Sequence, residues 1–242
     1  MAYINILRTN MIAKMYKKVA PLSKTEVLKL SPLKDYKHAK DVSTTLLTFN
    51  ELAQACKFYP IYFSVENDGV LPIAILGFND NNLFLDGKNN WEKNYYIPAV
   101  FRAYPLGMAK KEGSDDQYTV VYDSEHDGIN KKDGKPVADD KGELTEFGQK
   151  AVDFLQNLQG DINRTREAFK ILTEYNLLKF ANVDITKGEA KYQIKGVGMI
   201  DQEALEALED DKVLDLVKKG IYRLIVMHLL SVNNVRNLTE RV

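Results

Sequence analysis

The chain has 242 residues, with 33 Lys and Arg against 34 Asp and Glu, so its formal net charge is -1. A chain of this length can bury most of its apolar surface, in one large domain or two small ones. The near-zero charge gives no overall field that attracts nucleic acid, and no dense Lys/Arg cluster with interleaved aromatic residues appears, which argues against nucleic-acid binding. No apolar run reaches the roughly 18 residues that span a bilayer. A signal-peptide pattern is also missing, so the expected compartment is the cytoplasm.

The first residues are basic, because residues 1–24 contain Lys and Arg but no Asp or Glu. Their apolar residues could line one side of a helix that touches anionic lipid or a partner. The favoured alternative is an extended or frayed terminus. We expect residues 1–14 to be a flexible extension and residues 15–242 to form a single domain. A polar Gly/Asp/Lys loop at 123–142 is long enough to be mobile or functional and is a possible sub-domain boundary.

The first half of the chain is rich in strand signals. Thr48 and Glu51 match a capping box at the start of a short helix. Short apolar runs separated by Asn-, Asp- and Gly-rich turns predict an antiparallel three-stranded meander. The runs are 61–65, 73–78 and 83–85, and a further strand is expected at 118–122.

The second half changes to the helical period. Apolar residues at 3.6-residue spacing predict one amphipathic helix that Gly160 ends or bends and a second that ends near Leu178. A hairpin follows over 183–199 with its turn at Lys187-Gly188. Three helical segments complete the chain: 202–208 with Asp201 as N-cap, 213–219 with Asp210 or Asp211 as N-cap, and 221–232 after a break at Gly220. The predicted fold class is α+β, an antiparallel, strand-rich N-terminal half packed against helices of the C-terminal half.

Aromatic residues and prolines concentrate between Phe58 and Pro105, which includes the only Trp and four of the seven prolines. Arg102 lies among these aromatic residues, and a guanidinium can stack on a ring face while it binds a carboxylate or phosphate. This surface is the candidate site for a peptide or small ligand. The alternative is a structural role, in which Arg102 pairs with Asp86 or another carboxylate and stabilises the fold. The candidate ligand-binding residues are Asp86, Trp91, Tyr95, Tyr96, Arg102 and Tyr104.

The remaining reactive side chains are expected to be structural. Cys56, the only cysteine, is expected to be a small buried or half-buried hydrophobe. His126 lies among carboxylates that could bind a divalent metal, but a solvated turn is favoured. His38 is expected at the surface and His228 in the core with hydrogen-bond partners. No catalytic motif, phosphate loop or zinc-binding pattern is visible, so no catalytic residue, metal or cofactor is predicted.

From near Met15 the chain resembles the SapC proteins of bacteria. The order and spacing of the matching stretches agree over nearly the whole chain. They are 16–22, 58–63, 76–78, 82–86, Trp91, 96–98, 102–105, 198–201 and 228–231. Residues 1–14 lie upstream of where such proteins usually begin. Val27 stands where the family often has a His after the leading Pro-Leu, which weakens any role for that position.

The resemblance implies an association with surface-layer gene clusters or transport, and it supplies no established catalytic residues. The leading hypothesis is therefore a non-catalytic, cytoplasmic accessory or binding protein connected with the export of surface-layer proteins or peptides. It would recognise a polypeptide or small ligand at the aromatic surface around Arg102. A rival hypothesis is an enzyme that modifies peptides or amino-acid-derived substrates with residues that only the fold brings together. A third possibility is a homo-oligomer whose interface is the aromatic block.

Overall fold

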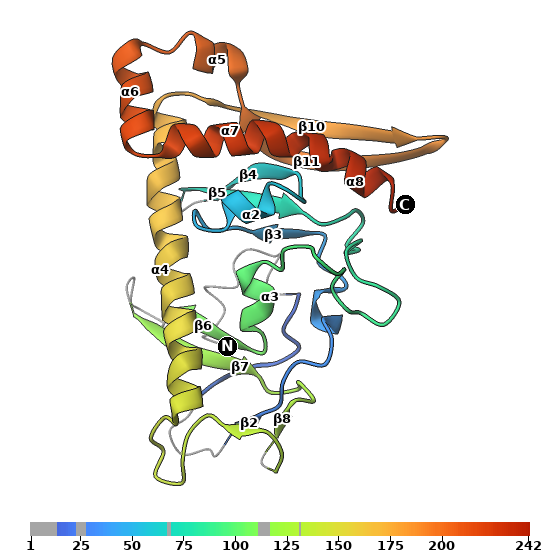
Figure 1. The fold of residues 1–242 in the computed structure, drawn as a ribbon, viewed down its shortest axis with the longest axis vertical. Coiled ribbons are helices and arrows are strands. Elements are labelled where there is room, and N and C mark those ends of the chain that lie inside the picture. The colour runs from blue at the N-terminus through green and yellow to red at the C-terminus, as the bar shows by residue number, and fades with distance from the viewer. Residues whose placement is uncertain (1–13, 23–27, 67–68, 111–116, 131) are drawn as a thin grey trace. The chain divides into compact units, whose positions relative to one another are not determined.

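The computed structural model describes residues 14–22, 28–66, 69–110, 117–130 and 132–242 (Figure 1). It contains antiparallel sheets and a largely helical C-terminal half, which confirms the predicted α+β class. The polypeptide divides into two compact units. Unit 1 consists of residues 1–42, 85–91 and 99–160, and unit 2 consists of residues 43–84, 92–98 and 161–242.

Unit 1 contains two small antiparallel sheets. The first has the order β1-β7-β6, with β1 Val19–Pro21, β7 Tyr118–Asp123 and β6 Leu106–Lys110. The predicted strand at 118–122 is therefore confirmed. Most of the basic N-terminal helix that the sequence allowed lies outside the described residues. Val19, which that helix would have included, is in a strand and pairs with Asp123.

The second sheet of unit 1 lies partly in the segment predicted to be a polar loop. Its order is β8-β2-β9, with β8 Ile129–Asn130, β2 Lys29–Leu30 and β9 Lys135–Pro136. The prediction of a loop throughout 123–142 was therefore wrong. Strands of two residues carry no detectable period, and only pairing with the distant β2 makes them strands.

One hydrophobic cluster of unit 1 gathers around four buried residues from separate segments: Leu28, Leu106, Tyr122 and Leu155. The described residues of this unit also form the 3-10 helix η1 Lys37–Ala39, the α-helix α3 Ala99–Ala103 and the first part of the long helix α4 Glu146–Glu174. Helix α3 buries Ala99, Val100 and Phe101, so it is anchored by its N-terminal turn.

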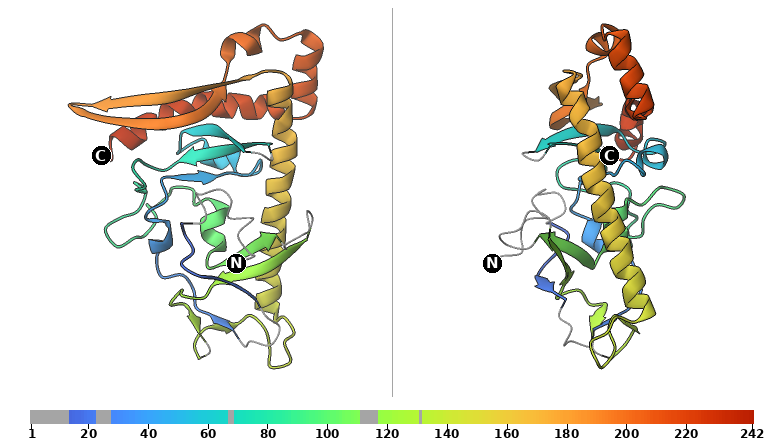
Figure 2. Two further views of the ribbon diagram at one scale, coloured as in Figure 1. Left: turned by 180° about the vertical axis from the view of Figure 1, so that it is seen from behind. Right: turned by 90° about the vertical axis from the view of Figure 1, so that its left-hand side faces the viewer.

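Helix α4 runs without interruption from Glu146 to Glu174 (Figure 2). The predicted end or bend at Gly160 was wrong, as was the extension of the second helix to Leu178. A single Gly inside a helix costs only about 1 kcal/mol relative to Ala. The buried residues Leu155, Ile162 and Phe169 on both sides of it supply more packing than that cost.

Unit 2 is built on a five-stranded antiparallel sheet with the order β10-β11-β4-β5-β3. Its strands are β3 Thr44–Leu46, β4 Ile61–Glu66, β5 Gly69–Ile75, β10 Leu178–Lys187 and β11 Ala190–Ile200. The predicted strand at 61–65 and the hairpin around Lys187-Gly188 are confirmed.

The meander prediction was partly wrong. The second apolar run forms a strand that ends at Ile75, and 83–85 forms no strand. The neighbour of β5 is instead β3, which precedes β4 in the sequence. Phe84 is 1% exposed and its ring meets that of Tyr59 edge-on at 4.7 Å. An apolar run that packs as a buried turn has the same composition as a buried strand, so the sequence pattern could not separate the two.

The helices of unit 2 begin and end mostly where the sequence predicts. Besides the second part of α4, the described residues form α2 Leu52–Ala55, α5 Gln202–Glu206, α6 Asp210–Lys218, α7 Ile221–Ser231, η2 Val232–Asn234 and α8 Val235–Thr239. The Asp201 carboxylate accepts hydrogen bonds from the backbone N–H groups of Glu203 and Ala204, which confirms its capping role. Gly220 has φ 73° and separates α6 from α7. The N-cap of α6 is Glu209, whose side chain makes no capping bond, rather than Asp210 or Asp211.

The predicted capping box is half formed. The Glu51 carboxylate accepts hydrogen bonds from the backbone N–H and the hydroxyl of Thr48, both at 2.9 Å. The Thr48 hydroxyl thus donates to the carboxylate instead of accepting from the Glu51 N–H. Glu51 is 5% exposed, so the side chain that was expected to cap a helix also serves as a buried hydrogen-bond centre.

Candidate functional site

The six residues predicted to form a ligand site fall in both units. Asp86, Trp91, Arg102 and Tyr104 belong to unit 1, whereas Tyr95 and Tyr96 belong to unit 2. The polypeptide passes from one unit to the other within the aromatic block itself. A site on this block is therefore described unit by unit.

Trp91 is an internal residue of unit 1. It is 7% exposed, and its ring meets Tyr36 edge-on at 5.6 Å and Phe101 at 5.1 Å. A bridge between Leu85 and Trp91 closes the loop that contains Asp86. Trp91 thus connects this loop with Phe101 of α3 in the interior of unit 1.

Asp86 is exposed and organises that loop. Its carboxylate accepts hydrogen bonds from the backbone N–H groups of Lys88 and Asn90 at 2.8 Å and from the Asn90 side chain. These bonds, first those from the Asn90 side chain, hold the pKa of the Asp86 carboxyl below its usual value. The carboxylate of Asp86 therefore binds groups of its own turn.

Arg102 is exposed and projects from α3. Its guanidinium carbon lies 5.6 Å from the centre of the Phe154 ring on α4, a contact that steadies the long side chain. Phe101, the preceding residue, is 0% exposed, so the backbone that carries the guanidinium is anchored by packing.

Tyr104 is at the centre of a cluster that the sequence did not reveal. The ring is 5% exposed and stacks on the His38 imidazole at 3.9 Å and 10°. His126 meets it edge-on at 5.0 Å, and Tyr16 does so at 5.4 Å. We call Tyr16, His38, Tyr104, Asp123 and His126 the imidazole–tyrosine cluster.

Asp123 is the buried acid of the imidazole–tyrosine cluster, with 0% exposure. Its carboxylate accepts hydrogen bonds from the Tyr104 hydroxyl at 2.8 Å and from the backbone N–H groups of Lys17 and Lys18 at 3.0 Å. Burial alone would raise the pKa of the carboxyl, but these bonds outweigh it and hold the pKa below its usual value. The charged carboxylate therefore ties β7 to the segment that enters β1.

The two imidazoles of the cluster are held neutral. Burial lowers the pKa of His38 to about 4, although a hydrogen-bond contact of 3.3 Å between its Nε2 and the Phe101 carbonyl favours the charged form. Burial also lowers the pKa of His126. The expectation that His38 is a surface residue was wrong, because the rings of Phe101 and Tyr104 pack against it. His126 closes a turn, as expected, by donating its backbone N–H to the Asp123 carbonyl.

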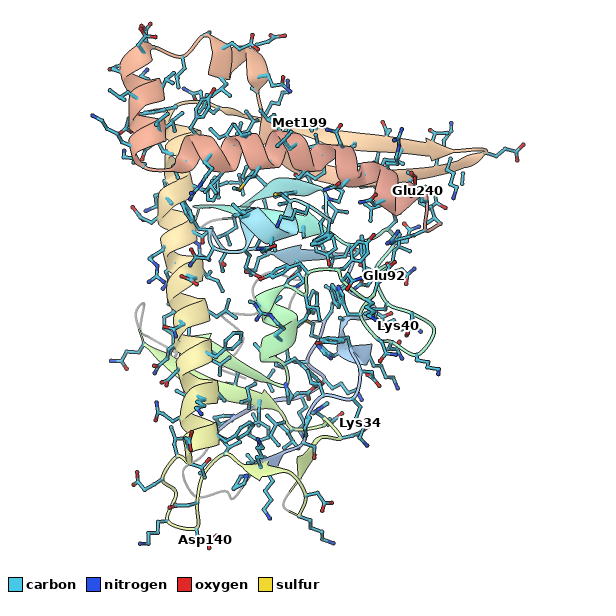
Figure 3. The ribbon with its side chains drawn as sticks, in the orientation of Figure 1. Lys34, Lys40, Glu92, Asp140, Met199 and Glu240 are labelled. Carbon is cyan, nitrogen blue, oxygen red and sulfur yellow. The ribbon has the colours of Figure 1, made fainter. Side chains whose placement is uncertain are left out.

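Tyr95 and Tyr96 take structural roles in unit 2. The ring of Tyr95 lies 5.1 Å from the Arg241 guanidinium, which also lies 4.7 Å from the ring of Phe84. Arg241 donates to Glu92, which is labelled in Figure 3. The Tyr96 hydroxyl donates to Glu51 at 2.9 Å, and its carbonyl accepts from the Tyr59 hydroxyl.

In unit 2, Arg241 thus forms the arrangement that the sequence suggested for Arg102: a guanidinium that contacts aromatic rings and binds a carboxylate. No signal in the sequence pointed to this residue, because it lies 149 positions from Glu92. Asp123, Tyr16 and Arg241 were all missed for the same reason. Each acts through a partner that is distant in sequence.

Chemically, the imidazole–tyrosine cluster offers neutral imidazoles beside a hydroxyl that donates to a carboxylate, and α3 offers an exposed guanidinium. Within the described ranges no group of three or more His, Cys, Asp and Glu residues is placed to hold a metal ion. In the same ranges no helix combines the length and the apolar character needed to cross a bilayer.

These observations define an α+β protein of two units, with structural roles for most of its aromatic block. Residues 24–238 match the SapC family, which covers nearly the whole chain. The protein belongs to the SapC family. No curated protein and no solved structure matches it.

Proposed function

We propose that this protein is a non-catalytic accessory protein associated with the export of bacterial surface-layer proteins or peptides, and that it binds a polypeptide or small ligand through Arg102. The observation that carries the proposal is the exposed guanidinium on a helix whose first turn is buried. The other predicted site residues of unit 1 act mainly as its support.

The support is visible in the packing below α3. Trp91 packs against Phe101, and Tyr104 at the end of α3 is fixed by its hydrogen bond to Asp123. A side chain presented from such a base loses less conformational freedom on binding than one on a loose loop. Its planar fork of N–H donors matches a carboxylate, so the favoured ligands carry one: an acidic polypeptide segment, the terminal carboxylate of a polypeptide or a small organic acid.

The experiment is a binding screen with three short peptides of equal length, one acidic, one neutral and one basic, read by fluorescence anisotropy. Arg102→Ala should abolish binding of the acidic peptide, and Arg102→Lys should weaken it, because lysine keeps the charge but not the fork. Arg236→Ala, which removes another exposed Arg on α8, is the matched control. Equal binding by the wild type and Arg102→Ala would refute the proposal.

The second candidate function is an enzyme that modifies peptides or amino-acid-derived substrates. The observation that favours it is the pair of imidazoles with lowered pKa on two sides of Tyr104, because a neutral imidazole can accept a proton at pH 7. Turnover of a peptide mixture, followed by mass spectrometry, tests it. Loss of product with His126→Gln, in a variant that still melts like the wild type, would favour the enzyme over the binding protein.

A further inference from the structure

His228 occupies an unusual position between two strands of unit 2. It is 2% exposed on α7, and its imidazole bridges the backbones of β4 and β11. Nδ1 lies 2.7 Å from the carbonyl oxygen of Ile61, and Nε2 lies 3.2 Å from the backbone nitrogen of Ile200. Met199, which precedes Ile200, is labelled in Figure 3.

The imidazole replaces a direct backbone hydrogen bond between β11 and β4. The paired residues of β11 and β4 are Gly198 and Phe63, and the antiparallel register places Ile200 opposite Ile61 two positions further on. The N–H of Ile200 and the carbonyl of Ile61 reach each other through the ring. Ser231 completes the junction, since its hydroxyl accepts from the Ile61 N–H at 3.1 Å and donates to the His228 carbonyl at 2.7 Å.

The hydrogen bonds determine which nitrogen carries the proton. The Ile61 carbonyl can only accept, so Nδ1 of His228 must donate to it. The Ile200 N–H can only donate, so Nε2 must be unprotonated and accept. Only the neutral Nδ1–H tautomer satisfies both contacts, and a proton on Nε2 would set two donors against each other.

We infer that His228 makes the junction of β11 and β4 depend on pH. The neutral imidazole holds β11 against β4, and protonation of Nε2 releases this junction. The released part is the end of the hairpin near Ile200. The pairing of β10 with β11 does not involve the imidazole and stays intact.

The surroundings of the ring favour its neutral form. The ring faces Tyr62 on β4, with 6.2 Å between ring centres, and Phe63, at 4.9 Å. Asp201 follows Ile200 in the sequence. It forms an ion pair with Lys179 of β10, with 3.6 Å between Oδ1 and Nζ. Burial lowers the pKa of His228 to about 4, with the Ile61 hydrogen bond acting in the opposite direction.

The sign of the pH effect follows from this lowered pKa. In the released junction the imidazole regains its ordinary pKa of 6.5, so the released form binds more protons than the closed form between pH 6.5 and 4. Above pH 6.5 the closed form has its full advantage over the released form. Below pH 6.5 the equilibrium constant for closing falls about tenfold for each pH unit, which amounts to a loss on the order of 10²-fold by pH 4.

The test is nuclear magnetic resonance of the ¹⁵N-labelled full-length protein between pH 7 and pH 4. At pH 7 the ring nitrogen shifts should report the Nδ1–H tautomer. On acidification the protection of the Ile200 amide against hydrogen exchange should fall on the order of 10²-fold, while the Ile194 amide, paired with Val183 inside the hairpin, keeps its protection. In His228→Gln, whose side-chain amide both donates and accepts but does not titrate, the Ile200 amide should lose this pH dependence.

The outcomes that overturn the inference are an Nε2–H tautomer at pH 7, or an Ile200 amide that stays protected to pH 4 in the folded wild type. Equal acid release in His228→Gln and wild type would also overturn it, including the case in which all amides of unit 2 lose protection together at the same pH. His38→Gln, which removes the other histidine with a pKa of about 4, is the control and should leave the Ile200 response unchanged.

Discussion

Arg241 donates a hydrogen bond from its Nη2 to Oε2 of Glu92 at 2.6 Å, although the two residues are 149 positions apart. The Arg241 side chain is 18% exposed and that of Glu92 is 44% exposed. The guanidinium also contacts the rings of Phe84 and Tyr95. The C-terminal residues are thereby joined to the aromatic block within unit 2.

We predict that Arg241→Ala lowers the free energy of unfolding by about 2 kcal/mol. The half-exposed ion pair contributes at most about 1 kcal/mol, and each ring contact adds roughly 0.5–1 kcal/mol. Glu92→Gln should cost less than about 1 kcal/mol, because the ring contacts remain. Urea denaturation checks both values, with Arg236→Ala as the control, and equal losses in Arg241→Ala and Arg236→Ala would contradict this account.

The buried carboxylate of Asp123 should be among the most sensitive positions of unit 1. Asp123→Ala leaves the Tyr104 hydroxyl and two backbone N–H groups without their acceptor, so we expect a loss of about 3 kcal/mol. Tyr104→Phe removes only one donor and should cost about 1–2 kcal/mol. Thermal unfolding measures both variants. The exposed Asp140, labelled in Figure 3, gives the control Asp140→Ala, and a similar loss there would count against the proposed role of Asp123.

The stability of unit 1 should fall when the pH is lowered through the range of His38. Its pKa is about 4 in the folded protein and ordinarily 6.5, so the unfolded protein binds more protons between these values. The stabilisation is complete above pH 6.5 and is lost as the pH falls to 4, by about 3 kcal/mol at most. His38→Gln should flatten the stability curve in this window, as measured by urea denaturation at each pH. A curve with the wild-type slope would contradict the prediction.

Asp123 adds a second, more acidic window. Its folded pKa lies below the ordinary 3.8, so its contribution is present above about pH 3.8 and is lost as the pH falls further. The Asp123 charge also raises the pKa of His38 and of His126. In Asp123→Asn the folded pKa of both imidazoles should therefore fall further, and the loss of stability on acidification should continue to a lower pH than in the wild type. Urea denaturation at each pH measures it, and an unchanged lower limit would contradict this coupling.

Gly148 lies in the first turns of α4, where Ala would ordinarily be preferred. A Cβ atom at this position would lie 1.9 Å from the carbonyl oxygen of Val137. We predict that Gly148→Ala destabilises the protein by about 1–3 kcal/mol, despite the gain of up to about 1 kcal/mol in helix preference. At Gly87 a Cβ atom would meet nothing within 4 Å, so Gly87→Ala should change stability by less than about 0.5 kcal/mol. Equal melting temperatures for the two variants would refute this close contact.

Local signals in the sequence predicted the elements that are stabilised locally. The hairpin turn at Lys187-Gly188, the N-cap at Asp201 and the helix break at Gly220 depend on neighbouring residues, and the structure confirms them. The same reasoning failed at Gly160 and at 83–85, where packing against distant segments decides the conformation.

The candidate site was only partly accessible to sequence reasoning. The exposure of Arg102 fits the expected surface role, whereas the burial of Trp91 and Tyr104 shows that a cluster of rings can be core as readily as surface. His228 was expected to be a core histidine with hydrogen-bond partners, and the structure confirms it. Its position between two strands could not be foreseen, because both partners are backbone groups.

The sequence by itself determined the α+β class, the family and most helix ends and turns, because these depend on periodic apolar residues and on capping and turn residues that are close neighbours. Tertiary structure alone decided that the Asp123 carboxylate binds the backbone that leads into β1, that Arg241 contacts Phe84, Tyr95 and Glu92, and that His228 joins β4 to β11. Each of these contacts joins groups more than a hundred residues apart in sequence, and no local pattern records which distant segments the fold brings together. At Asp123 and His228, burial also removes the competing water.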